Sequence, residues 1–264
     1  GEEIQLIKNP KKERVFTLWV NDNQGLPRIQ RLMVWSVLRQ GYILDLYTNV
    51  ELQEEFKEHI ENGNIVLHNP FELVEFGNDT EILPLSDLWR FEMLYKQGGT
   101  WIDSDMILLQ PLRPGHRCIV SSEHTMQSGA FKSKLPYVCN IGVLRFEKGD
   151  ALLETVLKKI RKMGSAKKIT SYMKQFNKDL VKWTNPGLYK SRPEDFCPVP
   201  WWDAKELFRY MNAFSTKYNV EVDSINNIIK NSNGIHLWNN ITKDLQDTAH
   251  EGSLFVLLEK LILK

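Results

Sequence analysis

Short apolar runs alternate with helical patterns over the first hundred residues. The runs at 14–20, 42–47 and 65–67 are rich in β-branched and aromatic residues, which is typical of buried strands. A helical face follows Pro27, and a charged helix is expected over 51–62. Strand, helix, strand, helix, strand predicts a parallel sheet with crossover helices. Such sheets bind ligands at the carboxyl ends of their strands.

The next block of the pattern ends in two aspartates. Residues 69–85 have the composition of a loop, and a helix is expected from about 86 to 97. Gly98–Gly99 stops that helix, because glycine takes the left-handed conformation at little cost. A strand over 100–102 then leads to Asp103 and Asp105. Residues two apart in an extended strand point to the same side, so the two carboxylates are expected to converge.

The alternation is less regular beyond Pro114. Strands are predicted at 118–121, 141–146 and 234–238, and helices at 150–163, about 166–182 and 252–263. The lysines between 158 and 182 are interpreted as a solvated face. The chain has no internal repeat, low-complexity segment or composition break. It is therefore expected to form one domain over 1–264.

Composition narrows the class of protein and its surroundings. Apolar residues make up 42% of the chain and charged residues 25%, as in a soluble protein with a real core, and a net charge of +1 gives no case for nucleic acid binding. No apolar run is long enough to span a membrane. Three widely spaced cysteines argue against a disulfide framework. We expect a cytoplasmic protein, with the Golgi lumen as the alternative if an N-terminal anchor was removed.

The two aspartates suggest a metal site. Carboxylates without a cysteine cluster suit Mg²⁺ or Mn²⁺, which keep open positions for phosphate oxygens. A lone D-x-D is commonly a solvated turn, but the apolar strand before Asp103 and the apolar run after Asp105 favour a buried site. His236 ends a short apolar strand, where a histidine is more often structural. As a nitrogen ligand, it would shift the preference toward Mn²⁺.

Other side chains have both a structural and a functional interpretation. Asp87 and Arg90 share a helical face, either as an ordinary ion pair or with Asp87 orienting Arg90 toward a phosphate. Trp19 ends the first strand, either as a core residue or as a ring that stacks on a base. Trp201 and Trp202 follow two prolines, either as a structural corner or as a platform for an acceptor sugar.

The stretch from Ser86 to Asp105 resembles the sugar-binding, D-x-D-containing glycosyltransferases of family 32 and their relatives, the large clostridial glucosylating toxins. Their pattern is S-D-x-x-R-x-x-x-L-x-x-x-G-G-x-Y-x-D-x-D. The matching residues are Ser86, Asp87, Arg90, Leu94, Gly98, Gly99, Trp101, Asp103 and Asp105. Trp101 stands where the family usually has Tyr, so the ring is kept and the phenol oxygen lost. Weaker similarity at 16–19, 139–142, 184–187 and 236–240 extends the resemblance over roughly 14–240.

The resemblance implies a GT-A fold, which is a single α/β domain with a Rossmann-like mixed central sheet flanked by helices. A donor-binding half would cover about 14–110, and an acceptor half with a C-terminal closure about 111–264. The implied activity is that of a metal-dependent, retaining hexosyltransferase. The donor would be a nucleotide-diphosphate sugar, with a UDP-sugar favoured over a GDP-sugar, and the acceptor a glycan or another hydroxyl group. The implied cofactor is Mn²⁺, with Mg²⁺ as the alternative.

The resemblance also implies roles for individual residues. Asp105 and His236 would bind the metal, and Asp103 would reach it directly or through water while holding donor hydroxyls. The expected catalytic residues are Asp87, Arg90 and Asn140. The expected donor-binding residues are Leu18, Trp19, Asp87, Arg90, Trp101, Asp103, Ser104 and Asn240, and the expected acceptor residues are Trp201 and Trp202. Since no second carboxylate is evidently placed as a nucleophile, front-face attack is expected rather than double displacement.

Two other functions stay open at this point. One is a sugar-nucleotide-binding protein without catalysis. The other is a phosphatase of the haloacid dehalogenase type, although its D-x-D normally follows the first strand of the domain. N-x-T sequons occur at Asn78 and Asn240. A glycan on Asn240 would obstruct the expected active site, which favours the cytoplasm.

Overall fold

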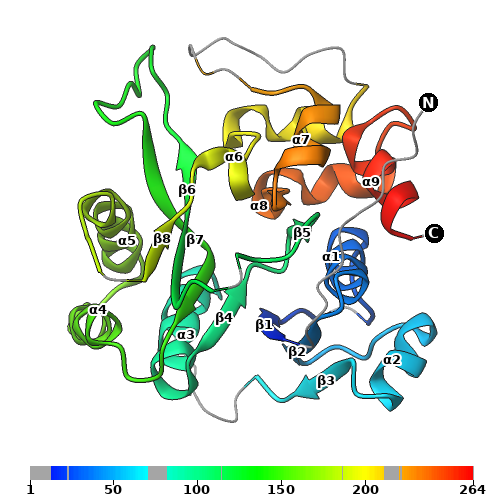
Figure 1. Ribbon diagram of the computed structural model, residues 1–264, viewed down its shortest axis with the longest axis horizontal. Helices are drawn as coiled ribbons and strands as arrows, with labels where there is room; N and C mark the ends of the chain where they lie inside the picture. The colour runs from blue at the N-terminus through cyan, green and yellow to red at the C-terminus, as the bar shows by residue number, and fades with distance from the viewer. Residues whose placement is uncertain are drawn as a thin grey trace.

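The computed structural model describes residues 13–22, 24–70, 82–113, 115–185, 187–210, 220 and 222–263 (Figure 1). The sequon at Asn78 lies outside the described residues. No helix in these ranges is long and apolar enough to cross a membrane. Cys118, Cys139 and Cys197 are buried as free thiols.

A seven-stranded mixed sheet runs through the protein in the order β3-β2-β1-β4-β7-β6-β8. Its strands are β1 (Arg14–Trp19), β2 (Ile43–Thr48), β3 (Ile65–His68), β4 (Gly99–Ile102), β6 (Cys118–His124), β7 (Tyr137–Phe146) and β8 (Leu188–Lys190). The first four are parallel, whereas β7 runs antiparallel to both β4 and β6. This is the Rossmann-like mixed sheet that the resemblance implied.

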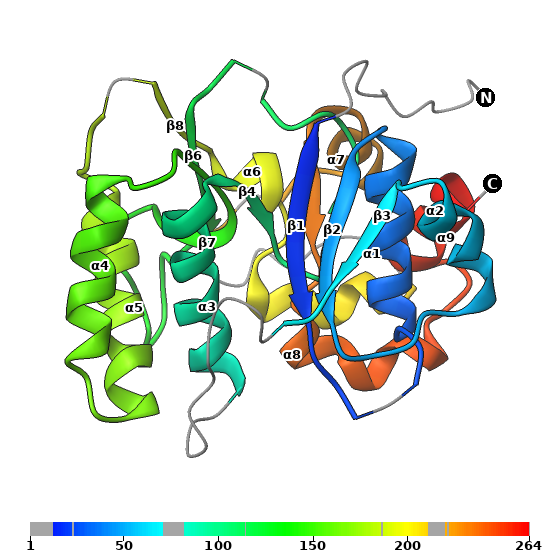
Figure 2. The same ribbon diagram turned by 90° about the horizontal axis from the view of Figure 1, so that it is seen from below.

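Helices cover both faces of the sheet (Figure 2). Neighbouring strand residues point to opposite faces: Val15 belongs to one apolar core and Phe16 to the other. The first core includes residues of α1 and α9, and the second includes residues of α3, α4 and α5. The helices are α1 (Arg28–Arg39), α2 (Lys57–Glu61), α3 (Ile82–Gln97), α4 (Ala151–Arg161), α5 (Ala166–Leu180), α6 (Pro193–Phe196), α7 (Ile225–Asn231), α8 (Asn239–Thr242) and α9 (Leu254–Ile262), with 3-10 turns at η1 (Glu54–Phe56), η2 (Trp201–Phe208) and η3 (Lys243–Thr248).

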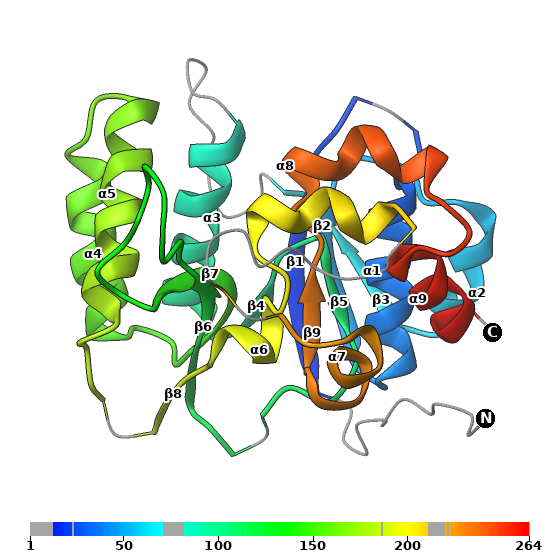
Figure 3. The same ribbon diagram turned by 90° about the horizontal axis from the view of Figure 1, so that it is seen from above.

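A separate two-stranded ribbon brings the C-terminal region to the D-x-D. Strand β5 (Met106–Leu108) pairs antiparallel with β9 (Gly234–His236), with Met106 opposite His236 (Figure 3). The ladder continues past the ribbon, because the Leu237 N–H donates to the Asp105 carbonyl at 3.1 Å. His236 is thereby fixed beside the aspartates by backbone pairing.

Several predicted boundaries were wrong. Helix α3 begins at Ile82 instead of 86, with Pro84 in its first turn, where a proline breaks no helical hydrogen bond. The predicted strand over 234–238 ends at His236. Trp238 has a left-handed backbone (φ 54°) and caps α8. The predicted helix over 51–62 is a 3-10 turn followed by the short α2. Strands β5 and β8 and helices α6 and α7 were not predicted.

Candidate active site

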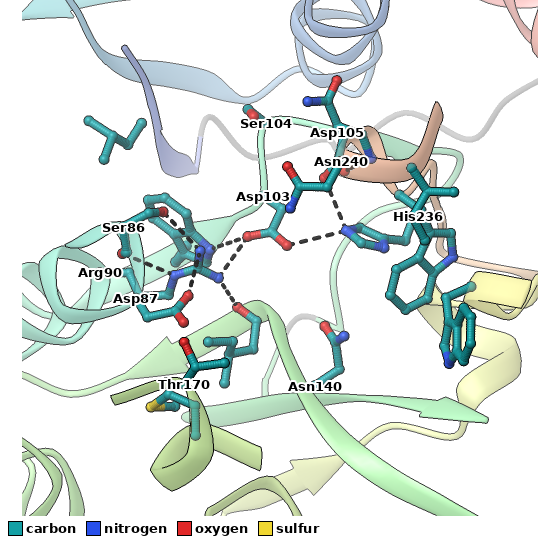
Figure 4. A pocket seen from close by; sticks show the side chains of 18 of the residues that line it. Ser86, Asp87, Arg90, Asp103, Ser104, Asp105, Asn140, Thr170, His236 and Asn240 are labelled. Atoms are coloured by element: carbon teal, nitrogen blue, oxygen red, sulfur yellow. Dashed lines mark hydrogen bonds and ion pairs between the residues drawn. The ribbon is translucent and has the colours of Figure 1, made fainter. Parts of the chain in front are cut away.

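A cavity of about 570 Å³ opens at the carboxyl ends of β1 and β4 (Figure 4). It is lined by the predicted residues Leu18, Trp19, Asp87, Arg90, Trp101, Asp103, Ser104, Asp105, Asn140, Trp201, His236 and Asn240. Trp202 is not among the described lining residues. Its ring instead meets Trp201 edge-on, with 5.6 Å between centroids. The structure therefore brings the predicted residues together from distant parts of the chain, with the exception of Trp202.

The two aspartates converge through a turn instead of an extended strand. Strand β4 ends at Ile102, and β5 begins only at Met106. The Met106 N–H donates to the Asp103 carbonyl at 3.0 Å, which closes the turn between the strands. The predicted convergence is thus present, but the predicted geometry was wrong because Asp103–Asp105 is not strand.

Asp103, Asp105 and His236 form a cluster with ligand atoms all within 4.8 Å of one another. The His236 Nε2 lies 3.0 Å from Asp105 Oδ1 and 3.3 Å from Asp103 Oδ2. The other ring nitrogen, Nδ1, is buried with no hydrogen-bond partner in the described part of the chain. Two carboxylate oxygens and one imidazole nitrogen facing a common point fit a divalent cation.

The two carboxylates of this cluster favour a positive charge on the group that faces them. Burial would lower the pKa of His236, but Asp105 and Asp103 outweigh it and raise that pKa to about 10. Burial would likewise raise the pKa of Asp103, but Arg90 and His236 lower it to about 2. Asp105 is further stabilised by the Asn239 N–H, which donates to Oδ2 at 2.7 Å. The left-handed backbone of Trp238 directs the chain into α8 immediately before that N–H.

Arg90 binds the other oxygen of Asp103. Its Nη1 donates to Asp103 Oδ1 at 2.7 Å and to the Ile141 carbonyl at 2.6 Å. Its Nη2 donates to Ser86 Oγ at 3.1 Å, and its Nε to the Ser86 carbonyl at 3.4 Å. The guanidinium lies over the Trp101 ring, 4.5 Å from the centroid, and Trp101 Nε1 also donates to Asp103 Oδ1. Arg90 is therefore held in one position.

Asp87 completes the surroundings of Arg90. The predicted ion pair is present, with 3.4 Å between Asp87 Oδ1 and Arg90 Nη2. Burial raises the pKa of Asp87 to about 6 against the opposing charge of Arg90. Asp87 thus adds an ion-pair partner to the four hydrogen bonds that the guanidinium donates to the protein.

A bulge in β7 supplies backbone groups to the site. Pairing with β6 is regular up to Val120 opposite Leu144 and resumes at Ser121 opposite Asn140. The β7 residues 141–143 between these pairs are free to bond elsewhere. The Ile141 carbonyl accepts from Arg90, the Gly142 carbonyl accepts from the Asp103 N–H at 2.8 Å, and the Gly142 N–H donates to Asn140 Oδ1 at 2.6 Å.

Helix α5 contributes a wall that the sequence did not indicate. Thr170, Met173, Lys174 and Asn177 recur at helical spacing and line the cavity. Lys174 is exposed, as the interpretation of the 158–182 lysines as a solvated face predicted, and its apolar stem can also cover a cavity wall while its charge stays in water. The only sequence signal for this wall is that Thr170, Lys174 and Asn177 share a helical face with Met173.

The mixed sheet, with the D-x-D turn at the end of β4, has the arrangement that the resemblance to GT-A glycosyltransferases implied. Two family models match consecutive parts of the chain: the glycosyltransferase sugar-binding region containing a DXD motif over residues 35–127, and the α-1,4-glycosyltransferase conserved region over 146–261. Both parts of the chain are therefore similar to glycosyltransferases, the first of them to the D-x-D sugar-binding region.

The curated relatives are also glycosyltransferases by name. The human lactosylceramide 4-alpha-galactosyltransferase is 25% identical over 255 residues, covering 90% of this chain and 62% of the relative. The Rattus norvegicus enzyme of that name is 26% identical over 193 residues, covering 68% of this chain and 47% of the relative. The chain thus spans less than two thirds of either relative.

Solved structures resemble the chain only distantly. The PaToxG glycosyltransferase has 11% identity and a TM-score of 0.37, covering 69% of this chain and 67% of the neighbour. The apo form of glycosyltransferase GlyE from Streptococcus pneumoniae TIGR4 has 12% identity and a TM-score of 0.39, covering 69% and 46%. The fold assignment accordingly depends on the sheet itself.

Proposed function

We propose that the protein is a metal-dependent, retaining glycosyltransferase. It would move a hexose from a nucleotide-diphosphate sugar, with UDP-sugars favoured, to a hydroxyl group of a glycan. One observation carries the proposal: Asp103 belongs both to the Asp105–His236 cluster and to the Arg90 network, within one cavity. Such a site would place a cation for the diphosphate directly beside polar groups for the sugar.

The cluster fits Mn²⁺ or Mg²⁺, held by Asp105 and His236 with Asp103 either bound directly or through water. When bound, the cation supplies positive charge opposite the departing diphosphate. Trp19 and Leu18, at the end of β1, would hold the nucleoside, and Ser104 and Asn240 would complete the donor site.

The donor sugar would lie among Asp87, Arg90 and Asn140. The carboxylates that line the described cavity are Asp87, Asp103 and Asp105, and each is already engaged with Arg90 or His236. This supports front-face attack by the acceptor instead of a covalent intermediate on the enzyme. Retention also agrees with the α-linkage in the names of the curated relatives.

Acceptor binding would use the side of the cavity opposite the nucleoside. Trp201 lines the cavity and is 42% exposed, which suits a ring that stacks on a sugar. We retain the cytoplasm as the proposed compartment, because Asn240 lines the cavity and a glycan on that sequon would block it.

A donor screen tests the proposal. Purified protein would be incubated with UDP-galactose, UDP-glucose, UDP-N-acetylglucosamine and GDP-mannose, each with Mn²⁺, Mg²⁺ or EDTA, and release of the nucleoside diphosphate measured. UDP-galactose comes first because the curated relatives are galactosyltransferases. We expect slow hydrolysis of at least one donor with Mn²⁺ and none with EDTA.

A binding measurement with the same donors and an assay with phosphate monoesters separate the alternatives. Metal-dependent binding of a donor without turnover, even with added glycan acceptors, would indicate a sugar-nucleotide-binding protein. Hydrolysis of simple phosphate monoesters, with no donor turned over, would indicate a phosphatase. If no donor is bound or turned over, the transferase proposal fails.

A further inference from the structure

Glu123 lies behind the cavity and contacts one of the expected catalytic residues. It is a partly buried residue of β6, opposite Val138 of β7. The Asn140 Nδ2 donates to Glu123 Oε2 at 2.6 Å. Glu123 is not among the described residues that line the cavity, whereas Asn140 is. Its carboxylate is therefore placed to act on Asn140, without contact with a ligand.

Contacts on both sides fix the Asn140 amide in one orientation. Its Oδ1 accepts the Gly142 N–H at 2.6 Å, and its Nδ2 donates to Glu123. An amide rotated by 180° would set an N–H against the Gly142 N–H and an oxygen against the carboxylate, so both contacts would become repulsive. One Nδ2 hydrogen then remains, and the Asn140 side chain points into the open space between Asp103 and His236 (Figure 4).

The bulge in β7 leaves Asn140 dependent on this support. The ladder with β6 is irregular between Val120 and Ser121, directly beside Asn140. Ser121 Oγ donates to the Asn140 carbonyl at 2.8 Å and accepts the Val143 N–H at 3.0 Å, which secures the backbone. Among the described residues, Glu123 is the one that accepts a hydrogen bond from the Asn140 side-chain nitrogen. Ser121 thus holds the backbone and reaches the amide oxygen at 3.4 Å, whereas Glu123 holds the amide nitrogen.

We propose that Glu123 is a positioning residue, which orients Asn140 so that its free Nδ2 hydrogen can bind the transferred sugar. The inference rests on the proposed glycosyltransferase function. It assigns Glu123 no covalent role, because a nucleophile must reach the donor and Glu123 lies outside the cavity lining.

A double-mutant cycle tests the proposal. Glu123→Leu keeps the approximate volume and removes the acceptor, and we expect kcat to fall about 10- to 100-fold, as for other supporting residues. The donor KM and the Mn²⁺ dependence should stay unchanged, because Asp105 and His236 are untouched. In an Asn140→Ala background, Glu123→Leu should have no further effect on kcat. Glu123→Gln retains an acceptor and should stay within about threefold of wild type.

Glu92→Leu is the matched control. Glu92 is a buried carboxylate of α3 that pairs with Arg161 of α4, outside the cavity lining. Its loss should lower the melting temperature and leave kcat unchanged. The proposal is overturned if Glu123→Leu keeps the wild-type kcat, lowers donor binding together with kcat, or acts equally with and without Asn140. Absence of turnover in the wild-type protein would instead count against the proposed function.

Discussion

Asp103 joins two ends of the cavity that are built differently. At the Arg90 end, the guanidinium donates four hydrogen bonds, one of them to the backbone of the β7 bulge, and forms an ion pair with Asp87. At the His236 end, two carboxylates face one imidazole, and only Asp105 has a further backbone donor, from Asn239. One end is satisfied by the protein itself, and the other concentrates negative charge.

This difference predicts different roles for the two ends of the cavity. To bind a phosphate with two hydrogen bonds, the Arg90 guanidinium would have to exchange contacts with the protein for contacts with the ligand. In the structure it holds Asp103 and the Ile141 carbonyl in place. The Asp105–His236 end is where the proposed cation would bind. Substitutions at the two ends should therefore fail in different ways.

The largest effect is expected from Asp105→Asn. The change removes one charge from the candidate metal site while keeping the acceptor for the Asn239 N–H. Loss of several kcal/mol of transition-state stabilisation corresponds to a fall of about 10³-fold or more in kcat/KM. Titration of Mn²⁺ by donor hydrolysis and by thermal shift should show lost metal dependence. Asp244→Asn, at an exposed position of η3, is the control; equal Mn²⁺ affinity in both variants would refute the metal assignment.

Arg90→Lys breaks the other end. An ammonium cannot reproduce the planar contacts to Asp103, Ile141 and Ser86 at once. We expect kcat/KM to fall about 10²–10³-fold, with Mn²⁺ binding retained. The matched control is Arg145→Lys, because Arg145 also donates to three groups beside the same sheet but lies outside the cavity lining.

Stability and activity should separate in this pair. Both lysine variants should lower the melting temperature, and only Arg90→Lys should lower turnover. If Arg90→Lys loses Mn²⁺ binding as completely as Asp105→Asn does, the two ends are not independent and the comparison fails.

The first half of the fold was predictable because its signals are local. Strands β1 to β3 and the crossover helix α1 have clear periodicity, and the D-x-D block, from Ser86 to Asp105, lies within one contiguous stretch. Errors arose where pairing is distant: β5 has three residues and exists only because it pairs with β9, more than a hundred residues away. Three residues are too few to show a period.

The supporting part of the site could not be predicted for the same reason. Glu123 is an ordinary charged residue in the sequence, and only the β6–β7 register places it against Asn140. The bulge at 141–143 is likewise a property of two strands together. Lys174 belongs to a lysine-rich helix, and the sequence does not indicate that one side of this helix lines the cavity.

Gly142→Ala tests the junction between the two ends. A Cβ at this position would lie 2.7 Å from Asn140 Oδ1 and 3.1 Å from Asp103 Oδ2, so both side chains would have to move. A displacement of this size should lower kcat by about 10- to 100-fold. Gly164→Ala is the control, because its Cβ would meet nothing within 4 Å. Equal kinetics of the two alanine variants would show that the close packing at Gly142 is not needed for turnover.

The smallest effect is expected outside both ends, at the tryptophan pair of η2. Trp201 lines the cavity and Trp202 does not, although the two are adjacent in sequence and touch. Loss of one stacking ring in Trp201→Ala should raise the acceptor KM about 2- to 10-fold. Donor hydrolysis without acceptor should be unchanged, because neither the Arg90 network nor the Asp105–His236 cluster includes Trp201. Trp202→Phe should leave the acceptor KM unaltered. If Trp202→Phe raised the acceptor KM more than Trp201→Ala did, the acceptor contact would belong to Trp202 and the prediction would be wrong.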